Sequence, residues 1–406
     1  MVREVRSLVA KFGGSPLRLA LVLAAAAVYG SYLVAAAAGG ELDLAVYRAG
    51  GAAAFSGHHL YTVQVSSLGY RFTYPPISAL LFAPISWLPQ QSAQVLWTLT
   101  SLVALWWVVR FTLGRYALPE VAANPTWQLA VFVLVALSDP LRVGLGLGQI
   151  NVLVALLVFA DLCGAVPRLP RGVMIGVAAA VKLTPLFLIA YLLAVRRTRD
   201  AAWAAATFLT VTAGAFVVMP DASADFWLRG YFSDLSHFGL GYVSNQSVNG
   251  LIVRLLGSPL HAKPFWFPAA LLVTVTVLWT ARRVEPARPW LSEAIALAAM
   301  LAVSPVSWIH HWIFVLPLVM ACIRLGADRR YRPVRWLGLA LTAVLLFRVV
   351  WLVPRTYRHS VPQFLLGSID ILLLLATLAT VCWMFRARPE HPAVTHGALP
   401  AGGIPR

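Results

Sequence analysis

Long apolar runs dominate this chain and restrict it to very few folds. They lie at 17–38, 96–113, 201–219, 265–281, 308–324, 334–353 and 364–385. A helix of about 20 residues crosses a hydrocarbon core about 30 Å thick. In lipid every backbone N–H and C=O must be paired within its own segment, which a helix achieves. The sequence therefore predicts an all-α polytopic membrane protein.

Composition supports this class and argues against a soluble nucleic-acid-binding protein. Of the 406 residues, 60% are hydrophobic and 12% are charged, which is too few to cover a soluble protein of this size. The formal net charge is +17, but the basic residues cluster in short stretches beside the apolar runs, a pattern that marks cytoplasmic loops. Cys163, Cys322 and Cys382 lack the spacing of a metal site and are interpreted as packing residues.

One apolar stretch is predicted to be broken in its middle. "AAAVKLTPLFL" places Lys182, Thr184 and Pro185 between two basic ends, and proline disfavours helix at the residue before it. Each half is too short to cross a bilayer, so the pair is expected to line a cavity within the protein. A similar pair, 127–138 and 150–163, is joined by "DPLRVGLGLGQ".

Counting these halves gives about 12 membrane helices in one domain over 1–386, with both termini in the cytoplasm. The tail at 387–406 is expected to be disordered. Two large periplasmic loops, 39–75 and 220–264, then face the same side as 139–149, the turn at Lys182, 304–311 and 354–360. These segments are rich in His, Asn, Gln, Tyr and Trp, so the polar chemistry is expected on one face.

Two acidic residues stand out after the fifteen in the chain are sorted by position. Asp43 follows the first apolar run and begins a predicted short helix, "LAVYRAGGAAAF", where it is either an N-cap or a catalytic base. Asp370 lies inside an apolar run and is either a functional group or the partner of Arg348. Asp139, before Pro140, is interpreted as a turn or cap residue.

Several polar motifs could contact a ligand. "YRFTYPPISALLFAPISWLP" (70–89) suits an interfacial or re-entrant segment, with Arg71 and Tyr74 at headgroup depth. "GLGLGQIN" is similar to an anion-binding glycine loop, a weak signal alone. "SNQSVNGLIVRLLG" holds three amides and Arg254, a combination that binds sugar hydroxyls or caps helices.

His310 and His311 in "SPVSWIHHWIF" are adjacent, so they point to different helix faces and are poor joint metal ligands. They could hydrogen-bond a substrate or Asp43, or only touch water at the membrane surface. Lys182 is a costly cation at a central position, and a lipid phosphate held in a cavity would offset that cost. Snorkelling to one membrane face is the alternative for Lys182.

Six motifs in this order resemble the actinobacterial polyprenol-phosphate-dependent mannosyltransferases of glycosyltransferase family 87. They are "LDLAVYRAGGAAAFSGHHLY", "FTYPPISALLFAPISWLP", "GLGQINVLVALLVFADL", "GVAAAVKLTPLFL", "NQSVNGLIVRLLG" and "SPVSWIHHW". The resemblance implies a GT-C fold in the plasma membrane with a periplasmic active site. It implies a polyprenyl phosphate mannose donor, a phosphatidylinositol mannoside acceptor and an inverting reaction that forms an α-(1→2) linkage. The length and motifs are similar to those of members that add the fifth mannose.

The family's essential aspartate matches Asp43, which implies the role of general base, and its histidine matches His310 or His311. Further residues expected to bind substrate are Tyr47, His58, Tyr61, Arg71, Tyr74, Gln149, Asn151, Lys182, Asn245, Gln246, Asn249, Arg254, Trp308, Arg348, Arg355 and Arg358. The cations among them would hold the donor phosphate. The chain has no Asp-x-Asp motif, so no metal or other cofactor is expected.

Three other functions compete with this interpretation. A lipomannan-branching mannosyltransferase or an arabinofuranosyltransferase of the same fold fits the sequence as well, because spacing does not identify the residues that contact the sugar. A transporter of lipid-linked sugars would also have broken helices, but it should show paired inverted halves, and no internal repeat is visible. A purely structural membrane subunit would not explain the polar motifs gathered on one face.

Overall fold

A computed structural model describes residues 15–56, 60–65, 69–235, 238–354 and 360–386. His58, Arg355, Arg358 and the tail at 387–406 lie outside the described residues. The described chain is mainly helical, as predicted. Its two strands, β1 (Gln64–Val65) and β2 (Tyr70–Arg71), pair antiparallel beside the first loop.

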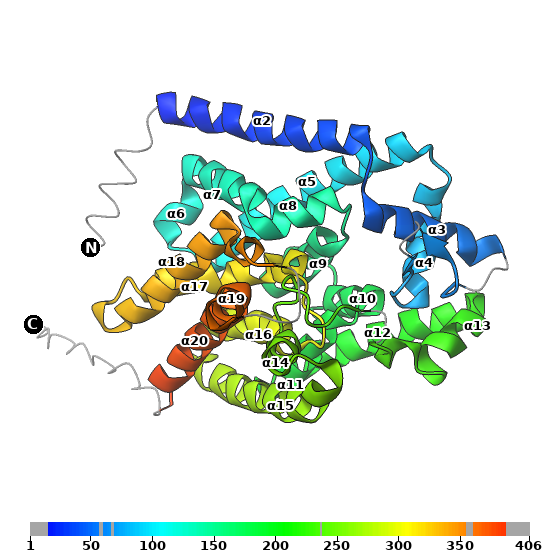
Figure 1. Cartoon of the computed structure of the whole chain (residues 1–406). Coiled ribbons are helices and arrows are strands. Elements are labelled where there is room, and N and C mark those ends of the chain that lie inside the picture. Colours follow the sequence, from blue (N-terminus) through cyan, green and yellow to red (C-terminus); the bar gives the residue numbers. More distant parts are fainter. Residues whose placement is uncertain (1–14, 57–59, 66–68, 236–237, 355–359, 387–406) are drawn as a thin grey trace, which may run out of the picture.

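The helices follow one another closely along the chain (Figure 1). The first half comprises α2 (Ser15–Ala38), α3 (Leu42–Ser56), α4 (Pro76–Ser86), α5 (Gln90–Tyr116), α6 (Pro119–Ala123), α7 (Pro125–Leu137), α8 (Asp139–Gly146), α9 (Asn151–Cys163), α10 (Val173–Val181), η1 (Thr184–Leu186), α11 (Phe187–Ala194) and α12 (Thr198–Val218). The second half comprises α13 (Pro220–Ser223), the π-helix η2 (Ala224–Leu228), η3 (Tyr231–Ser233), α14 (Val248–Leu256), α15 (Pro259–Val284), α16 (Pro289–Val303), η4 (Ile309–Val315), α17 (Leu316–Leu325), η5 (Arg329–Tyr331), α18 (Arg332–Phe347), η6 (Val349–Leu352), α19 (Val361–Gly367) and α20 (Ile369–Met384).

Four helices among the described residues are long and apolar enough to cross a membrane, namely α2, α5, α12 and α15. Two bent pairs, α7 with α8 (63°) and α19 with α20 (69°), each qualify only when the pair is taken as one broken span. Other apolar helices have 10–17 residues and are short for a crossing. The expected count of about twelve membrane helices therefore stays a prediction.

The predicted break at Lys182 is confirmed. Helix α10 ends at Val181, Lys182 has an extended backbone (φ −146°, ψ 123°), and the chain resumes as η1 and α11. Pro185 lies at the start of η1, where a missing N–H breaks no helical hydrogen bond. The linker expected between the other pair of half-helices is itself helical as far as Gly146 and forms α8.

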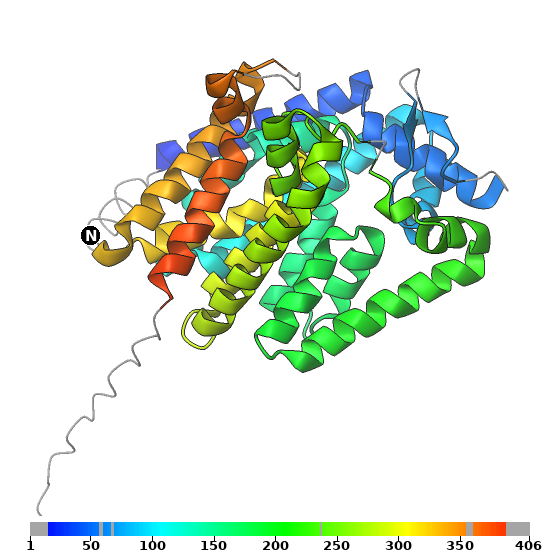
Figure 2. The same cartoon turned by 60° about the horizontal axis from the view of Figure 1, so that its bottom comes forward.

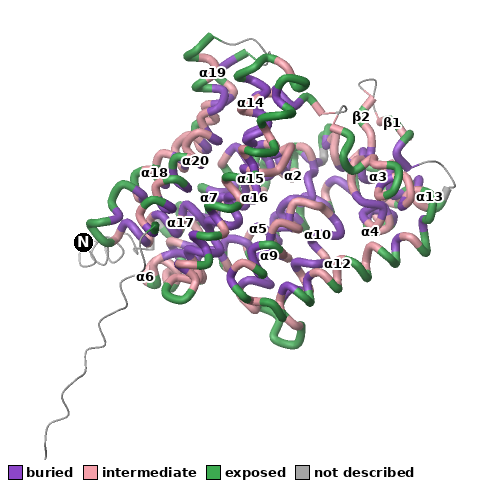
Figure 3. The backbone as a smooth tube through the Cα atoms, turned by 90° about the horizontal axis from the view of Figure 1, so that it is seen from below, coloured by how far each residue is buried: buried purple, intermediate pink, exposed green. Residues whose placement is uncertain are grey.

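Helix α16 forms the centre of the molecule. All its residues from Leu291 to Ala302 are buried, and its many alanines let neighbouring helices approach closely. Glu293 within it accepts two hydrogen bonds from Arg115 at 2.9 Å and lies 3.4 Å from Arg197, which ties α16 to α5 and to the start of α12. Figure 3 shows the contrast with α12, whose outer surface is largely exposed.

Helices α3 and α4 pack tightly at one end of α2, and α12 runs out toward them in Figure 2. A Cβ on Gly51 of α3 would lie 2.7 Å from the Phe82 backbone of α4, so the close approach requires glycine here. The short helix predicted after the first apolar run is thus confirmed, and α4 holds it in place. This packing sets the position of Asp43 in the first turn of α3.

Candidate active site

A cavity of about 1380 Å³ lies where α3, the 69–75 segment, η1 and η4 meet. Its wall combines side chains from five sequence motifs that are far apart in the chain. Nine of the predicted site residues line it: Asp43, Tyr47, Arg71, Tyr74, Gln149, Lys182, Trp308, His310 and His311. The fold therefore brings nine of the sixteen predicted site residues that the structure describes to one place.

Asp43 is held by the segment that leads into α9. Its backbone N–H donates to the Leu147 carbonyl at 2.9 Å, and its Oδ2 accepts a 2.5 Å hydrogen bond from Gln149 Nε2. Burial raises the pKa of Asp43 to about 6, although the Gln149 amide and the positive charge of Lys182 oppose that shift. A carboxylate that is tied to a different segment and faces a cavity fits a base better than an N-cap.

Gln149 is the hub of the hydrogen-bond network around Asp43. Its Oε1 accepts from Tyr47 (3.0 Å), Tyr74 (3.3 Å) and Asn151 (3.2 Å), and the two tyrosine hydroxyls lie 2.9 Å apart. With its oxygen occupied by donors, the Gln149 amide nitrogen must point at the carboxylate. The network therefore fixes the orientation of Asp43.

Gly148 allows this loop to sit against α3. Its φ is +69°, and a Cβ there would lie 2.7 Å from Leu44 Cβ and 2.9 Å from Glu41 Oε2. Both the left-handed backbone and the lack of space require glycine. The "GLGQ" stretch, first compared with an anion-binding loop, thus supports α3 and orients Gln149.

Lys182 lies in the same cavity with neutral partners. Its Nζ donates to Asn151 Oδ1 at 2.6 Å and lies 3.1 Å from His311 Nε2 and 3.5 Å from the Tyr74 hydroxyl. Within the described part of the chain no carboxylate approaches this ammonium group to salt-bridge distance. An ammonium that lines a cavity without a direct anionic partner is suited to bind an anion there.

The two histidines differ in what they contact. His311 is engaged by Lys182, while neither ring nitrogen of His310 has a hydrogen-bond partner among the described residues. Asn151 Nδ2 donates to the His310 backbone carbonyl at 3.0 Å, which fixes this part of η4 beside α9. Both side chains are buried, so His310 offers its ring nitrogens to a molecule in the cavity.

The amide cluster expected to bind sugar lies behind the cavity wall instead. Asn245 Oδ1 accepts from the Ser307 N–H at 2.9 Å, the Gln246 N–H donates to the Ser307 carbonyl at 2.8 Å, and Asn249 Nδ2 donates to the Pro305 carbonyl at 3.0 Å. The Gln246 side chain donates to the Gly367 carbonyl at 2.7 Å and accepts from the Ile371 N–H at 3.1 Å. The amide side chains are therefore bound to backbone, and the bonds to Pro305 and Ser307 hold the segment that leads to the histidines. We infer that the cluster positions η4.

Three other predicted binding residues are not among those that line the cavity. Arg254 donates to Ser368 Oγ and to the Asn245 carbonyl, both at 2.9 Å, and the Tyr61 hydroxyl donates to the Tyr74 carbonyl at 3.0 Å. Arg348 forms a 2.7 Å ion pair with Asp139. The suggested pairing of Arg348 with Asp370 is therefore wrong, and Asp139, interpreted as a turn or cap residue, is buried as an ion-pair partner.

Sequence reasoning gave no role to Glu41, which lies two residues before Asp43. It is buried, its Oε1 accepts a 2.8 Å hydrogen bond from Thr98, and burial raises its pKa to about 7. It packs against the loop at Gly148 that orients Gln149. The Glu-x-Asp spacing is the sequence signal that could have identified it. The aromatic wall formed by Phe187, Trp266 and Trp351 was also missed.

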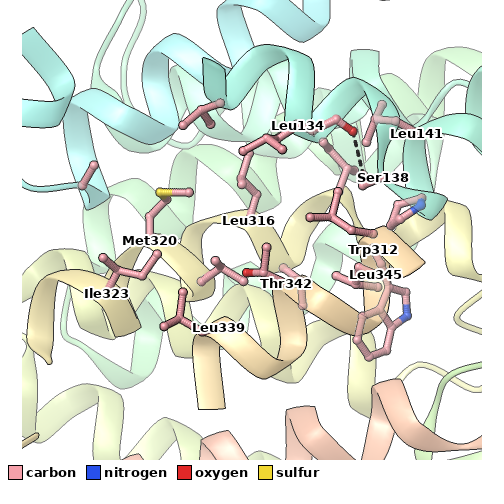
Figure 4. Close-up of a pocket in the computed structure, with 18 of the residues that line it drawn as sticks. Leu134, Ser138, Leu141, Trp312, Leu316, Met320, Ile323, Leu339, Thr342 and Leu345 are labelled. Carbon is pink, nitrogen blue, oxygen red and sulfur yellow. Dashed lines mark hydrogen bonds between the residues drawn. The ribbon is translucent and has the colours of Figure 1, made fainter. Parts of the chain in front are cut away.

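A second cavity, of about 500 Å³, is almost purely apolar (Figure 4). It lies between α7, α17 and α18, with Leu134, Leu316, Met320 and Leu339 along it. Helix α8 packs against η4, and this pair contributes to both cavities: Leu141 and Trp312 face the apolar one. The two cavities are thus on different sides of the same two elements.

Comparison with known proteins identifies the family. The model of glycosyltransferase family 87 matches residues 72–305, which include Gln149 and Lys182. The chain belongs to glycosyltransferase family 87. No solved structure matches it.

Three relatives are similar to this protein over most of its length. A polyprenol-phosphate-mannose-dependent α-(1-2)-phosphatidylinositol mannoside mannosyltransferase of Mycobacterium tuberculosis is 30% identical over 89% of both chains. The protein of the same description from Mycolicibacterium smegmatis is 33% identical over 77% of this chain and 75% of the relative. A phosphatidylinositol pentamannoside mannosyltransferase of M. smegmatis is 32% identical over 86% and 85%.

Proposed function

We propose that the protein transfers mannose from a polyprenyl phosphate mannose donor to a phosphatidylinositol mannoside and forms an α-(1→2) linkage. The curated relatives carry this activity in their names. The observation that supports it most is that one cavity holds both a half-buried carboxylate, Asp43, and an ammonium group, Lys182, that forms no ion pair with any described carboxylate.

Asp43 acts as the general base. Its carboxylate takes the proton from the acceptor hydroxyl as that oxygen attacks the anomeric carbon of mannose. With a pKa of about 6 the carboxylate is mostly ionised at pH 7, yet it remains basic enough to accept the proton. Gln149 holds it in the orientation for attack and stabilises its charged form.

Lys182 receives the leaving group. As the new bond forms, the bond between the anomeric carbon and the phosphate oxygen breaks, and the polyprenyl phosphate leaves with the negative charge. This leaving group is already an anion and needs a cation more than a proton. Lys182 supplies the charge, and its contact with His311 keeps it beside the cavity. His310 and Arg71, which also line the cavity, are available to sugar hydroxyls and to the phosphate.

A base on one side of the sugar and a cation on the other gives inversion in a single displacement. One carboxylate is sufficient for this route, because no covalent glycosyl intermediate has to form. The cavity is assigned to the periplasmic side of the plasma membrane, because the basic segments mark the opposite face. A lipid-linked donor can act there without a nucleotide.

A transfer assay tests this function. Membranes containing the protein should transfer labelled mannose from polyprenyl phosphate mannose to a tetramannosylated or smaller phosphatidylinositol mannoside, and an α-(1→2)-specific mannosidase should release the label. Polyprenyl phosphate arabinofuranose serves as the competing donor. Transfer of arabinose in place of mannose, or a product resistant to the mannosidase, would contradict the proposal.

A further inference from the structure

The cavity contains a strongly apolar side that the transfer reaction itself does not explain. Apolar side chains from different elements form it: Leu183 beside η1, Phe187 of α11, Phe226 of η2, Phe232 of η3 and Trp266 of α15. A sugar and a phosphate need polar neighbours, so this surface is suited to a hydrocarbon.

In the sequence, two residues of this apolar side follow shortly after Lys182. Leu183 directly follows Lys182, and Phe187 comes one turn later at the start of α11; all three line the cavity. A lipid phosphate held by Lys182 would therefore have its chain next to Leu183 and Phe187. Asp43, in contrast, is flanked in the cavity by Leu42 and Val46 of α3.

The same side reaches the outer surface of the molecule at α15. Trp266 lines the cavity, whereas its neighbours Phe265 (58% exposed) and Phe267 (66% exposed) point outward from a helix that is apolar enough to cross a membrane. Phe232, also in the wall, is 48% exposed. The cavity wall is thus continuous with the surface that lipid would cover.

We propose that the isoprenoid chain of the donor leaves the cavity between α11 and α15, across Phe187 and Trp266. This inference rests on the proposed function, since it requires a polyprenyl phosphate donor. The chain then meets lipid at Phe265 and Phe267, while the phosphate stays at Lys182. The acceptor enters from the Asp43 side, so the two lipids do not compete for one opening.

The apolar cavity of Figure 4 is the alternative binding site for the isoprenoid chain. Its lining is more purely apolar, but the packed pair of α8 and η4 lies between it and the polar cavity. A chain attached to a phosphate at Lys182 would have to pass these elements to reach it. An isoprenoid chain that leaves along the surface beside α11 would not have to pass α8 and η4.

Donors of two chain lengths separate these possibilities. The ratio of kcat/KM for full-length polyprenyl phosphate mannose to kcat/KM for a ten-carbon analogue reports contacts with the distal chain. Trp266→Ala removes an indole that contacts several methylene groups, and loss of about two such contacts corresponds to roughly a tenfold change. We expect this ratio to fall on the order of tenfold in Trp266→Ala and also to fall in Phe187→Ala.

Trp127→Ala is the matched control, because Trp127 lines the apolar cavity and is likewise half-buried. Its ratio should stay at the wild-type value. A fall in Trp127→Ala but not in Trp266→Ala would assign the chain to the cavity of Figure 4 and overturn the inference. If Trp266→Ala and Phe187→Ala both fold and both keep the wild-type ratio of the two kcat/KM values, the inference would be overturned as well. Wild-type protein that uses neither donor would instead refute the proposed function itself.

Discussion

Gln149→Leu should raise the apparent pKa on the acidic side of the pH–rate profile. Gln149 Nε2 donates to the ionised form of Asp43, and loss of a hydrogen bond to a charged group costs about 1.5–3 kcal/mol. One pKa unit corresponds to about 1.4 kcal/mol, so the pKa of Asp43 should rise from about 6 by about one unit or more.

The direction of the change in rate with pH depends on which protonation state of Asp43 reacts. The base acts only when deprotonated, so kcat/KM of the wild type should fall as the pH drops through about 6. In the variant this fall should begin about one unit higher, near pH 7. At pH 6 the ionised fraction then drops from about one half to about one tenth, whereas at pH 8.5 little of the difference in ionisation remains.

Initial rates of mannose transfer between pH 5 and 9, at saturating acceptor and limiting donor, measure this shift. Gln128→Leu is a suitable control, since Gln128 is also buried and hydrogen-bonded but lies on α7, outside the cavity wall. The control should keep the wild-type midpoint even if it unfolds at lower temperature. A Gln149→Leu profile that overlays the wild type would refute the link between Gln149 and the ionisation of the base.

Three further predictions concern the supports of the site and its cofactor requirement. Gly148→Ala should lower the free energy of unfolding by about 1–3 kcal/mol and reduce transfer, because Ala is strained at φ +69° and its Cβ overlaps Leu44. Gly146→Ala is the control: a Cβ there would meet open space, so this variant should resemble wild type in melting and transfer assays. Lys182→Met should raise KM for the donor about 10–100-fold through loss of a charge-assisted contact, while comparable donor saturation in both proteins would count against phosphate binding. Transfer should continue at full rate in excess EDTA, because the proposed reaction uses Lys182 to stabilise the leaving phosphate; activity restored only by Mg²⁺ or Mn²⁺ would contradict this.

The local breaks and the polar motifs were predictable because they depend on local chemistry. Pro185 disfavours helical backbone at the residue before it, and a carboxylate directly after the first apolar run is expected near the membrane surface. The convergence of Asp43, Lys182 and His311 follows from the same reasoning, since all three were assigned to one face of the membrane.

The division of polar residues between cavity and scaffold was not predictable. Asn245 and Gln149 are both amides next to a helix start, yet Asn245 holds the backbone at Ser307 and Gln149 holds Asp43. Their roles depend on which distant segment packs opposite, and spacing along the chain carries no information about that. For the same reason Arg348 was matched with Asp370, although the fold places Asp139 beside it.

Asp43→Asn tests the central claim most directly, because asparagine keeps the shape of the side chain and removes its basicity. In membranes with equal amounts of both proteins, labelled mannose transfer should fall about 10²–10⁴-fold in kcat, with KM for the donor nearly unchanged. Transfer by the folded variant within a few-fold of the wild-type rate would mean that another group takes the proton from the acceptor.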